Sequence, residues 1–479
     1  MIRGEGHITG DRSPRVRVGI LRAASIRFQL NGQYLTPGSG EPWSGSGEAG
    51  IRNGRVEVMQ ETRLITSPGI TSPGVATAGG AASPGGAAPS GTILFEPREP
   101  DSAYFELFDV VIGIGFHWER REDQRFRGTL VLEILDGLIQ VINEIPVESY
   151  LASVISSEMN AGSPPEFLKA HAVISRSWLL AQMERKNALD GNGPRKQSMR
   201  ETGEELIRWY DREDHDTFDV CADDHCQRYQ GITRAHHPEV AGAVQSTAGE
   251  VLFYGDEICD ARFSKCCGGI TERYEHCWEE VPHPYLQPVP DRPETAGGAI
   301  PDLRVERNAV AYIRSRPEAF CNTSDRELLG MVLNDYDLAS KDFFRWQVSY
   351  SQEELAALVR EKSGRDFGKI LDLVPVERGA SARLVRLKIV GTQQTITIGK
   401  ELEIRRWLSR SHLYSAAFTV QKEGFREGVP GKFILHGAGW GHGVGLCQIG
   451  AAVMADRGYT YHQILLHYYR NATIRKCYE

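Results

Sequence analysis

The sequence lacks long apolar runs. None of its 479 residues belong to a stretch near the roughly 20 apolar residues that span a bilayer, so we expect no membrane span. The first residues, Met1–Gly10, lack the apolar core of a signal peptide. The chain has no block of basic residues and a net charge of −8, which argues against a nucleic-acid partner.

The sequence also lacks an even set of cysteines. It has nine, and they are clustered, which favours metal binding or paired use over a disulfide scaffold. With 41% hydrophobic residues, a chain of this length can bury the cores of more than one domain.

Alternating apolar residues predict a β-rich N-terminal region. Residues 15–65 and 92–145 show the two-residue period of half-buried strands. The intervening residues 66–91 are rich in Gly, Pro, Ala and Ser, and we expect a flexible loop there. Asp136-Gly137 separates two apolar runs and suits the tight turn of a hairpin.

Two helices are predicted between residues 144 and 178, with a break at 160–164. Apolar residues at helical spacing form one face of the first helix: Val147, Leu151, Val154 and Ile155. Glu158 falls on the same face, in the last turn, where the helix field is negative. Burial and this field both disfavour the charged carboxylate, and a protonated acid is what a general acid requires.

The second helix supplies cations. Ser163 and Glu166 match a capping box, and Lys169 and Arg176 follow. Glu158 could therefore be a buried acid that pairs with Arg176 and joins the two helices, since structural ion pairs also shift protonation. Spacing alone leaves the catalytic and the structural interpretations open.

A cluster of metal-binding residue types follows. Two imidazoles and two thiols suit tetrahedral zinc: His215, Cys221, His225 and Cys226. The spacing is not that of a standard zinc finger, and adjacent His225 and Cys226 need a bent backbone to bind one ion. The alternatives are a Cys221–Cys226 disulfide, buried thiols, or a site that recruits Cys266, Cys267 or Cys277.

Two later stretches are rich in glycine. Gly268-Gly269 permits close approach of a ligand or strand, and Glu272 follows, either as a functional acid or as a solvated turn residue. Alternate glycines from 437 to 445 suggest a bare floor that carries His436, Trp440 and His442 and suits a sugar ring. The register fits neither a dinucleotide fingerprint nor a phosphate cradle.

Two of these stretches resemble the hallmark motifs of the stage II sporulation protein D family, which includes the amidase enhancer LytB. They are Tyr150–Arg176 and Gly439–Ala451, and Arg262–Glu272 resembles a third block. The resemblance implies a lytic transglycosylase that cleaves peptide-free glycan strands of bacterial peptidoglycan, with Glu158 as the general acid and base. It also implies a structural zinc site in some members and an extracytoplasmic, cell-envelope location, although no signal peptide is visible.

We further expect the hallmark blocks to build one cleft. The candidate substrate-binding residues are Arg176, Ser264, Gly269, Thr271, Glu272, Trp440, His442, Gly443 and Gln448. One alternative is a non-catalytic wall-binding protein that enhances an amidase. Another makes Cys447 a thiol nucleophile beside His442.

The predicted fold is α+β, with a β-rich N-terminal part and a helical catalytic core that contains a mixed sheet. The predicted organisation is a tail at 1–14, the β-rich region at 15–145, and the core at 146–479 with insertions near 187–214 and 290–430.

Overall fold

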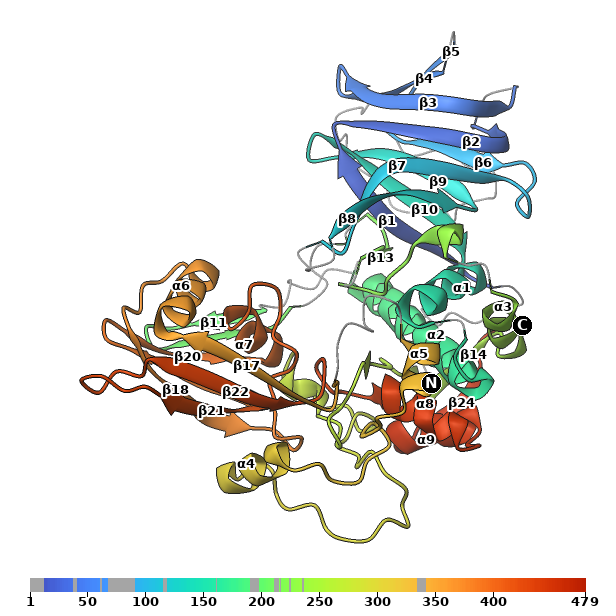
Figure 1. The fold of residues 1–479 in the computed structure, drawn as a ribbon. Helices are drawn as coiled ribbons and strands as arrows, with labels where there is room; N and C mark the ends of the chain where they lie inside the picture. Colours follow the sequence, from blue (N-terminus) through green and yellow to red (C-terminus); the bar gives the residue numbers. More distant parts are fainter. Residues whose placement is uncertain are drawn as a thin grey trace. The chain divides into compact units, whose positions relative to one another are not determined.

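The computed structural model shows an α+β protein (Figure 1). It describes residues 13–37, 41–60, 63–67, 91–114, 119–160, 162–189, 198–210, 215, 217–223, 225–234, 237–333 and 342–479. The predicted flexible loop at 66–91 lies almost entirely outside these residues. Within the described chain, no helix combines the length and the apolar character that a membrane crossing needs.

The chain divides into two compact units. The strand-rich unit comprises Ile8–Glu158, Asp214–Ala248 and Tyr478–Glu479, and the C-terminal unit comprises mainly Met159–Glu213 and Gly249–Cys477. This division groups residues 146–158 with the strands that precede them, whereas the sequence prediction starts a new region at residue 146.

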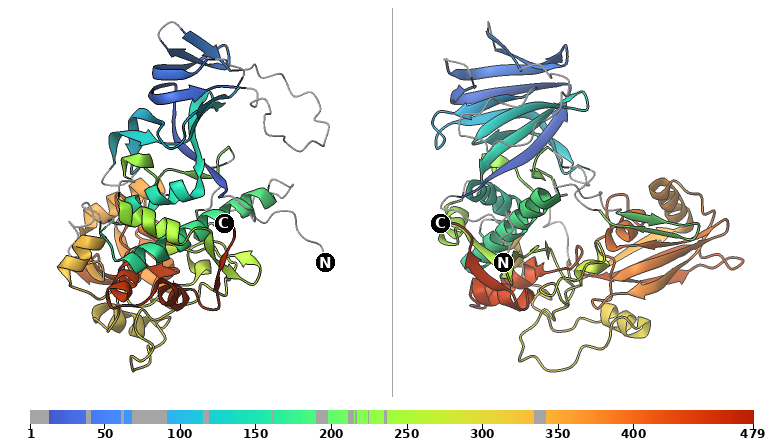
Figure 2. Two further views of the ribbon diagram at one scale, coloured as in Figure 1. Left: turned by 90° about the vertical axis from the view of Figure 1, so that its right-hand side faces the viewer. Right: turned by 180° about the vertical axis from the view of Figure 1, so that it is seen from behind.

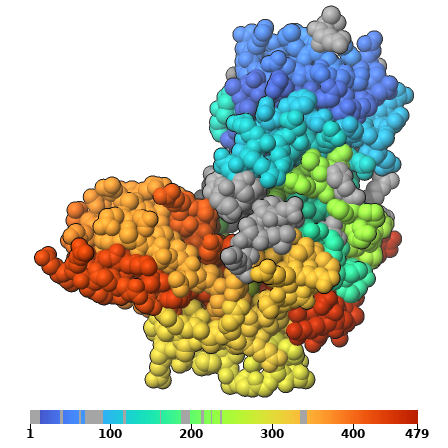
Figure 3. Space-filling model, in the orientation of Figure 1, coloured from blue at the N-terminus to red at the C-terminus, as the bar shows by residue number. Residues whose placement is uncertain are grey.

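An eleven-stranded sheet forms the strand-rich unit, in the order β13-β1-β10-β9-β6-β2-β3-β4-β5, with β7 joined to β2 and β8 joined to β7. Its strands are β1 Arg15–Ala23, β2 Ser25–Leu35, β3 Trp43–Arg52, β4 Arg55–Gln60, β5 Arg63–Thr66, β6 Ile93–Pro97, β7 Tyr104–Ile112, β8 Arg120–Phe126, β9 Thr129–Leu135, β10 Leu138–Pro146 and β13 Val220–Cys221. The predicted alternation is confirmed, because Ile26, Phe28 and Leu30 are all buried. Figure 3 shows the residues of β2–β4, in blue, as one continuous packed surface.

The predicted hairpin is confirmed in β9 and β10. These strands pair in antiparallel register, and Asp136 and Gly137 at the turn both have positive φ, 51° and 76°. A primed two-residue turn requires such values. β10 leads directly into α1, Val147–Glu158, and the unit also contains η1, Gly231–Thr233, and α3, Pro238–Ser246.

The C-terminal unit begins with α2, Pro165–Leu189, which is one continuous helix (Figure 2). Its predicted capping box is wrong. The Ser163 hydroxyl donates to the carbonyl of Asn160 at 2.6 Å, and the Glu166 carboxylate binds Lys169 and the Tyr461 N–H. The other helices are η2 Tyr274–His276, α4 Glu306–Arg314, α5 Arg326–Val332, α6 Gln352–Ser363, α7 Glu401–Trp407, α8 Gln448–Asp456 and α9 Tyr461–Tyr468.

Four small sheets complete this unit. Their orders are β11-β12-β20-β19-β18, β17-β22-β21, β15-β14-β24 and β16-β23. The strands are β11 Met199–Glu201, β12 Glu205–Arg208, β14 Glu250–Tyr254, β15 Glu257–Ile258, β16 Phe263–Ser264, β17 Arg345–Ser351, β18 Ile370–Arg378, β19 Leu384–Gly391, β20 Thr395–Gly399, β21 Phe418–Glu423, β22 Lys432–Ala438, β23 Leu446–Cys447 and β24 Thr473–Lys476.

Candidate functional site

Glu158 is the last residue of α1, at the end of the apolar face that the sequence predicted. The four apolar residues of that face are fully buried: Val147, Leu151, Val154 and Ile155. Glu158 itself is only half-buried. Its Oε1 accepts a hydrogen bond from the backbone N–H of Arg228 at 3.1 Å. The carboxylate is therefore oriented by the protein and still accessible.

The segment that carries this N–H packs along α1. Tyr229 stacks on Tyr150 with ring centroids 5.0 Å apart, and the N–H of Gln230 donates to the Ser153 hydroxyl at 3.1 Å. The Arg228 guanidinium donates to the Ser157 carbonyl at 3.3 Å. Because these contacts repeat along the helix, residues 227–230 set the position of the Glu158 carboxylate.

Directly before this segment, the structure brings the four predicted metal ligands together. The ligand atoms of His215, Cys221, His225 and Cys226 lie within 4.8 Å of one another. Cys226 Sγ is 3.3 Å from His215 Nε2 and 3.6 Å from His225 Nδ1, and Cys221 Sγ is 4.0 Å from His225 Nδ1. All nine cysteines are free, so a Cys221–Cys226 disulfide is not present.

The geometry of this His-Cys cluster fits a tetrahedral ion. Zinc bonds of about 2.3 Å to sulfur and about 2.0 Å to nitrogen place S and N ligands about 3.6 Å apart, within the observed range. Adjacent His225 and Cys226 can both reach one point because the chain turns there, with the Cys226 N–H donating to the Asp223 carbonyl at 3.1 Å. Cysteine and histidine are the donors that zinc prefers.

In the C-terminal unit, the expected bare floor of glycines is wrong. A Cβ on Gly437 would lie 2.0 Å from the Trp346 ring, and one on Gly445 would lie 1.9 Å from the Arg262 carbonyl oxygen. A Cβ on Gly443 would lie 2.4 Å from Cζ of Arg383. The glycines allow close packing of the protein against itself, so this side of the segment is closed.

Arg383 fills the space above Gly443. It is 1% exposed and donates to the carbonyl oxygens of Gly441 and Cys267 at 3.1 Å each. It also donates to the Ser381 hydroxyl at 3.0 Å. The guanidinium thus ties the C-terminal hallmark block to residues 266–269, which we call the Cys-Cys-Gly-Gly turn.

Two side chains of the hallmark block remain half-buried, Trp440 and His442. Trp440 stacks on Tyr414 with ring centroids 4.1 Å apart. His442 Nδ1 accepts the Val444 N–H at 3.0 Å. Burial, followed by the nearby charges of Arg262 and Arg383, lowers the pKa of His442 well below its usual value, so the ring is neutral.

The two hallmark blocks meet inside the C-terminal unit through a different pair. His171 of α2 and Gln448 of α8, 277 residues apart, are joined by a 3.0 Å hydrogen bond. Burial lowers the pKa of His171 to about 3, so this ring is also neutral. Arg176, five residues further along α2, is fully buried and donates to the Glu250 carbonyl at 3.0 Å. Glu158 belongs to the other unit, so its pairing with Arg176 and the shared cleft stay predictions.

Glu272 is a fully buried acid with several donors. It binds His276 Nδ1 at 2.8 Å and the Ser381 hydroxyl at 2.6 Å, and it accepts the N–H of Arg273 at 2.9 Å. Burial raises the pKa of Glu272, but these bonds outweigh burial and the net pKa is lowered. Burial lowers the pKa of His276, and Glu272 more than offsets this, so its net pKa is raised.

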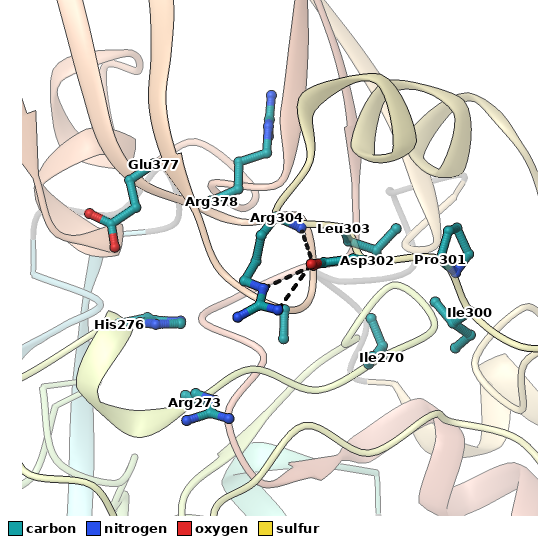
Figure 4. A pocket seen from close by; sticks show the side chains of 11 residues that line it. Ile270, Arg273, His276, Ile300, Pro301, Asp302, Leu303, Arg304, Glu377 and Arg378 are labelled. Carbon is teal, nitrogen blue, oxygen red and sulfur yellow. Dashed lines mark hydrogen bonds and ion pairs between the residues drawn. The ribbon is translucent and has the colours of Figure 1, made fainter.

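His276 lines a cavity of about 560 Å³ (Figure 4). Three arginines line the same cavity, Arg273, Arg304 and Arg378, together with Asp302 and Glu377. Arg304 is bound to Asp302 at 2.9 Å, as the dashed lines show. His276 was not among the residues predicted from the sequence, although Glu272 and His276 are four residues apart and contact at that spacing is common.

The remaining predicted substrate contacts are buried. Thr271 and Gln448 are at most 2% exposed, and the Ser264 side chain is also buried. A Cβ on Gly269 would lie 2.4 Å from the Tyr312 hydroxyl. Their part in substrate binding stays a prediction. The Arg228 N–H was missed because a backbone donor has no signature in the sequence.

Two parts of the chain match models of known protein families. Residues 136–254, which contain Glu158 and the His-Cys cluster, match the model described as Stage II sporulation protein. Residues 272–445 match a second model, Domain of unknown function (DUF8618).

Three named relatives have similar sequences. Stage II sporulation protein D of Bacillus amyloliquefaciens is 25% identical over 334 residues, 70% of this chain and 75% of the relative. The protein of the same name in Bacillus subtilis is 24% identical over 336 residues, 70% and 76% of the two chains. The amidase enhancer of Bacillus subtilis is 24% identical over 244 residues, 48% of this chain and 32% of that protein. The hallmark blocks, the domain match and both kinds of relative agree, and together they support the SpoIID/LytB family for this chain.

Proposed function

We propose that the protein is a lytic transglycosylase that cleaves peptide-free glycan strands of peptidoglycan, with Glu158 as its single acid and base. The observation that carries this proposal is the half-buried Glu158 carboxylate at the end of α1, held by the Arg228 N–H at 3.1 Å. Family membership supplies the substrate class.

One carboxyl group suffices for this reaction. The protonated acid first donates its proton to the glycosidic oxygen, and the bond to the anomeric carbon breaks. The carboxylate then removes the proton from the C6 hydroxyl of the same sugar, and that oxygen bonds to the anomeric carbon. The products are a free hydroxyl and a 1,6-anhydro ring, and the acid is regenerated. No second carboxylate is needed to activate water, in contrast to hydrolytic glycosidases.

The His-Cys cluster would hold a structural zinc ion in this enzyme. Four protein ligands leave no open position for water or substrate. Cys226 is followed at once by residues 227–230, which pack on α1 and orient Glu158. Ligation of an ion by Cys226 would therefore help to fix residues 227–230, which position the acid.

Contacts with the sugar would come from the two half-buried side chains of the C-terminal hallmark block. The Trp440–Tyr414 stack offers an aromatic face, and His442 lies beside it in sequence. Arg176, Thr271, Glu272 and Gln448 would act as positioning residues, because they are buried and bonded within the protein.

Product analysis on peptide-free glycan strands tests the proposal. The wild type should release products with 1,6-anhydro ends, and reactions in ¹⁸O-labelled water should incorporate no label. Glu158→Gln, which keeps the shape but cannot donate the proton, should lower the rate by at least about 10³-fold. Glu239→Gln, on an exposed position of α3 in the same unit, is the matched control. Label in the products, or full activity of Glu158→Gln, would refute the mechanism.

The relative named amidase enhancer supports a second candidate, a wall-binding partner that stimulates an amidase. The same variants separate the two. Stimulation of a purified cell-wall amidase by wild type and Glu158→Gln alike, without glycan cleavage by either, would establish the enhancer.

A further inference from the structure

A second cluster of metal-binding side chains lies inside the C-terminal unit. The ligand atoms of Cys267, Asp291, Cys321 and Cys447 lie within 4.8 Å of one another. All four residues are at most 2% exposed. They come from separate parts of the chain, because 54 residues separate Cys267 from Cys321 and 180 separate Cys267 from Cys447. We call this set the Cys-Asp cluster.

The sulfur spacing in this cluster is that of a tetrahedral thiolate site. Cys267 Sγ and Cys321 Sγ are 3.7 Å apart. Two thiolates bound to one zinc at about 2.3 Å are about 3.8 Å apart. A disulfide would require the sulfurs to be about 2.05 Å apart. Three cysteines and one carboxylate give four donors, the number that a closed zinc site uses.

The burial and the hydrogen bonds of Asp291 point the same way. Its carboxylate is fully buried and accepts bonds from the Cys321 N–H at 2.8 Å and the Tyr468 hydroxyl at 2.6 Å. Among the residues that the structure describes, it forms no ion pair. An ionised carboxylate without a cationic partner is costly to bury. A divalent cation between the four donors would supply the missing positive charge.

Backbone donors surround the sulfurs. The Cys267 N–H donates to Cys447 Sγ at 3.2 Å, and the Gly269 N–H donates to Cys267 Sγ at 3.4 Å. Gly268 and Gly269 have φ of 82° and 112°, which turns the chain around the sulfur. Hydrogen bonds of this kind orient metal ligands and stabilise thiolates.

We infer that the Cys-Asp cluster is a second, buried metal site that binds one zinc-like divalent ion through three thiolates and the Asp291 carboxylate. The ion has a structural role. It ties Cys447 to the Cys-Cys-Gly-Gly turn, and Cys447 directly precedes Gln448, which bonds to His171 of α2. Thus the ion fixes the start of α8 against the Cys-Cys-Gly-Gly turn. This role is independent of the His-Cys cluster in the other unit.

Metal analysis of the full-length chain, purified under reducing conditions, tests this inference. We expect two zinc ions per chain in the wild type and one in Cys221→Ser, in which only the Cys-Asp cluster is intact. Cys321→Ser should also retain one. Cys259→Ser, which removes a buried thiol outside both clusters, should retain two and is the matched control.

Cobalt substitution keeps the inference testable if Cys321→Ser fails to fold. Cys221→Ser loaded with Co²⁺ should show intense thiolate-to-cobalt charge-transfer bands and tetrahedral ligand-field bands. Three results would overturn the inference: one zinc per wild-type chain that Cys221→Ser abolishes, a Cys267–Cys321 disulfide in mass spectra of the protein purified without reductant, or an iron–sulfur chromophore in the wild type.

Discussion

Two regions of this chain were predicted from the sequence to carry functional side chains, and the structure gives them different physical roles. Residues 215–230 with α1 form the first, and the glycine-rich block 437–448 forms the second. In the first, the chemically active groups are side chains that meet near the surface, and Glu158 and His225 remain accessible. In the second, the glycines are closed over by Trp346, Arg383 and Arg262.

The comparison shows what a glycine-flanked polar residue can mean. Alternate glycines can leave space for a ligand, but here the space is occupied by other parts of the protein. Substitutions in the first region should therefore change metal content and activity. Substitutions of the glycines in the second should change mainly the free energy of unfolding.

The largest effect is expected for Cys221→Ser in the first region. Loss of a structural ion removes folding free energy, so we expect a loss of about 3 kcal/mol or more together with one zinc per chain. Glycan cleavage should fall as well, because residues 227–230 lose their anchor. Urea unfolding and metal analysis measure this, with Cys259→Ser as control. Unchanged stability together with unchanged zinc content would show that the His-Cys cluster is not a structural metal site.

Gly445→Ala tests the second region. The residue has φ of 71°, and a Cβ would lie 1.9 Å from the Arg262 carbonyl oxygen. Strain and overlap together should cost about 3 kcal/mol. Gly458→Ala has a similar φ of 87° but no atom within 4 Å, so it isolates the backbone cost of about 1 kcal/mol.

Thermal unfolding of both glycine variants gives the comparison. Equal melting temperatures for Gly445→Ala and Gly458→Ala would mean that the space above Gly445 is open in solution. The glycine-rich block would then be accessible, like the first region, and could serve as a ligand-binding floor.

Local features were predictable because neighbouring residues determine them. Ser351 with Glu354 and Thr460 with Gln463 form capping boxes at the starts of α6 and α9, each between residues three apart in the sequence. Asp136-Gly137 fixes its hairpin for the same reason. The capping box expected at Ser163 failed because distant groups, among them the Tyr461 N–H, bind Glu166 instead.

Long-range contacts were beyond the sequence because nothing local encodes them. Nothing in the sequence indicates that Arg383 fills the space above Gly443. Nothing in it indicates that Asp291 and Cys321 meet Cys267. The His-Cys cluster was predictable since its four members are close in sequence. The Cys-Asp cluster depends on the fold, which joins four segments that are distant in the sequence.

Arg228→Pro tests whether the first region positions the acid through its backbone. Proline removes the N–H that donates to Glu158 Oε1, while Arg228→Ala keeps it. We expect kcat for Arg228→Pro to fall about 10-fold with little change in KM, because misplacement of the acid affects mainly the chemical step.

Arg228→Ala should stay within about 3-fold of the wild type. Both variants must retain their zinc for the result to count, since Cys226 lies close by. If Arg228→Ala loses as much activity as Arg228→Pro, the guanidinium rather than the N–H positions the acid, and the backbone argument is wrong.

The smallest effect is expected on the pH dependence of stability, to which the Glu272–His276 pair contributes. The folded-state pKa of His276 is raised above its ordinary value near 6.5, so its contribution to stability is complete below pH 6.5. It is lost as the pH rises through the folded-state pKa. The folded-state pKa of Glu272 is lowered, so its contribution is complete above about pH 4.5 and is lost as the pH falls through its folded-state pKa.

The contribution of this pair to the stability of the C-terminal unit should therefore be largest between about pH 4.5 and 6.5, where both groups contribute fully. Above that window, His276→Gln should lose the part of the pH dependence that belongs to this pair, on the order of 1 kcal/mol. Urea unfolding of wild type and variant at pH 5.5, 7 and 9 measures it. The His276 ring also faces Glu275 and Glu377, whose charges raise its pKa further. Identical pH profiles for the two proteins would show that the buried pair does not titrate in this range.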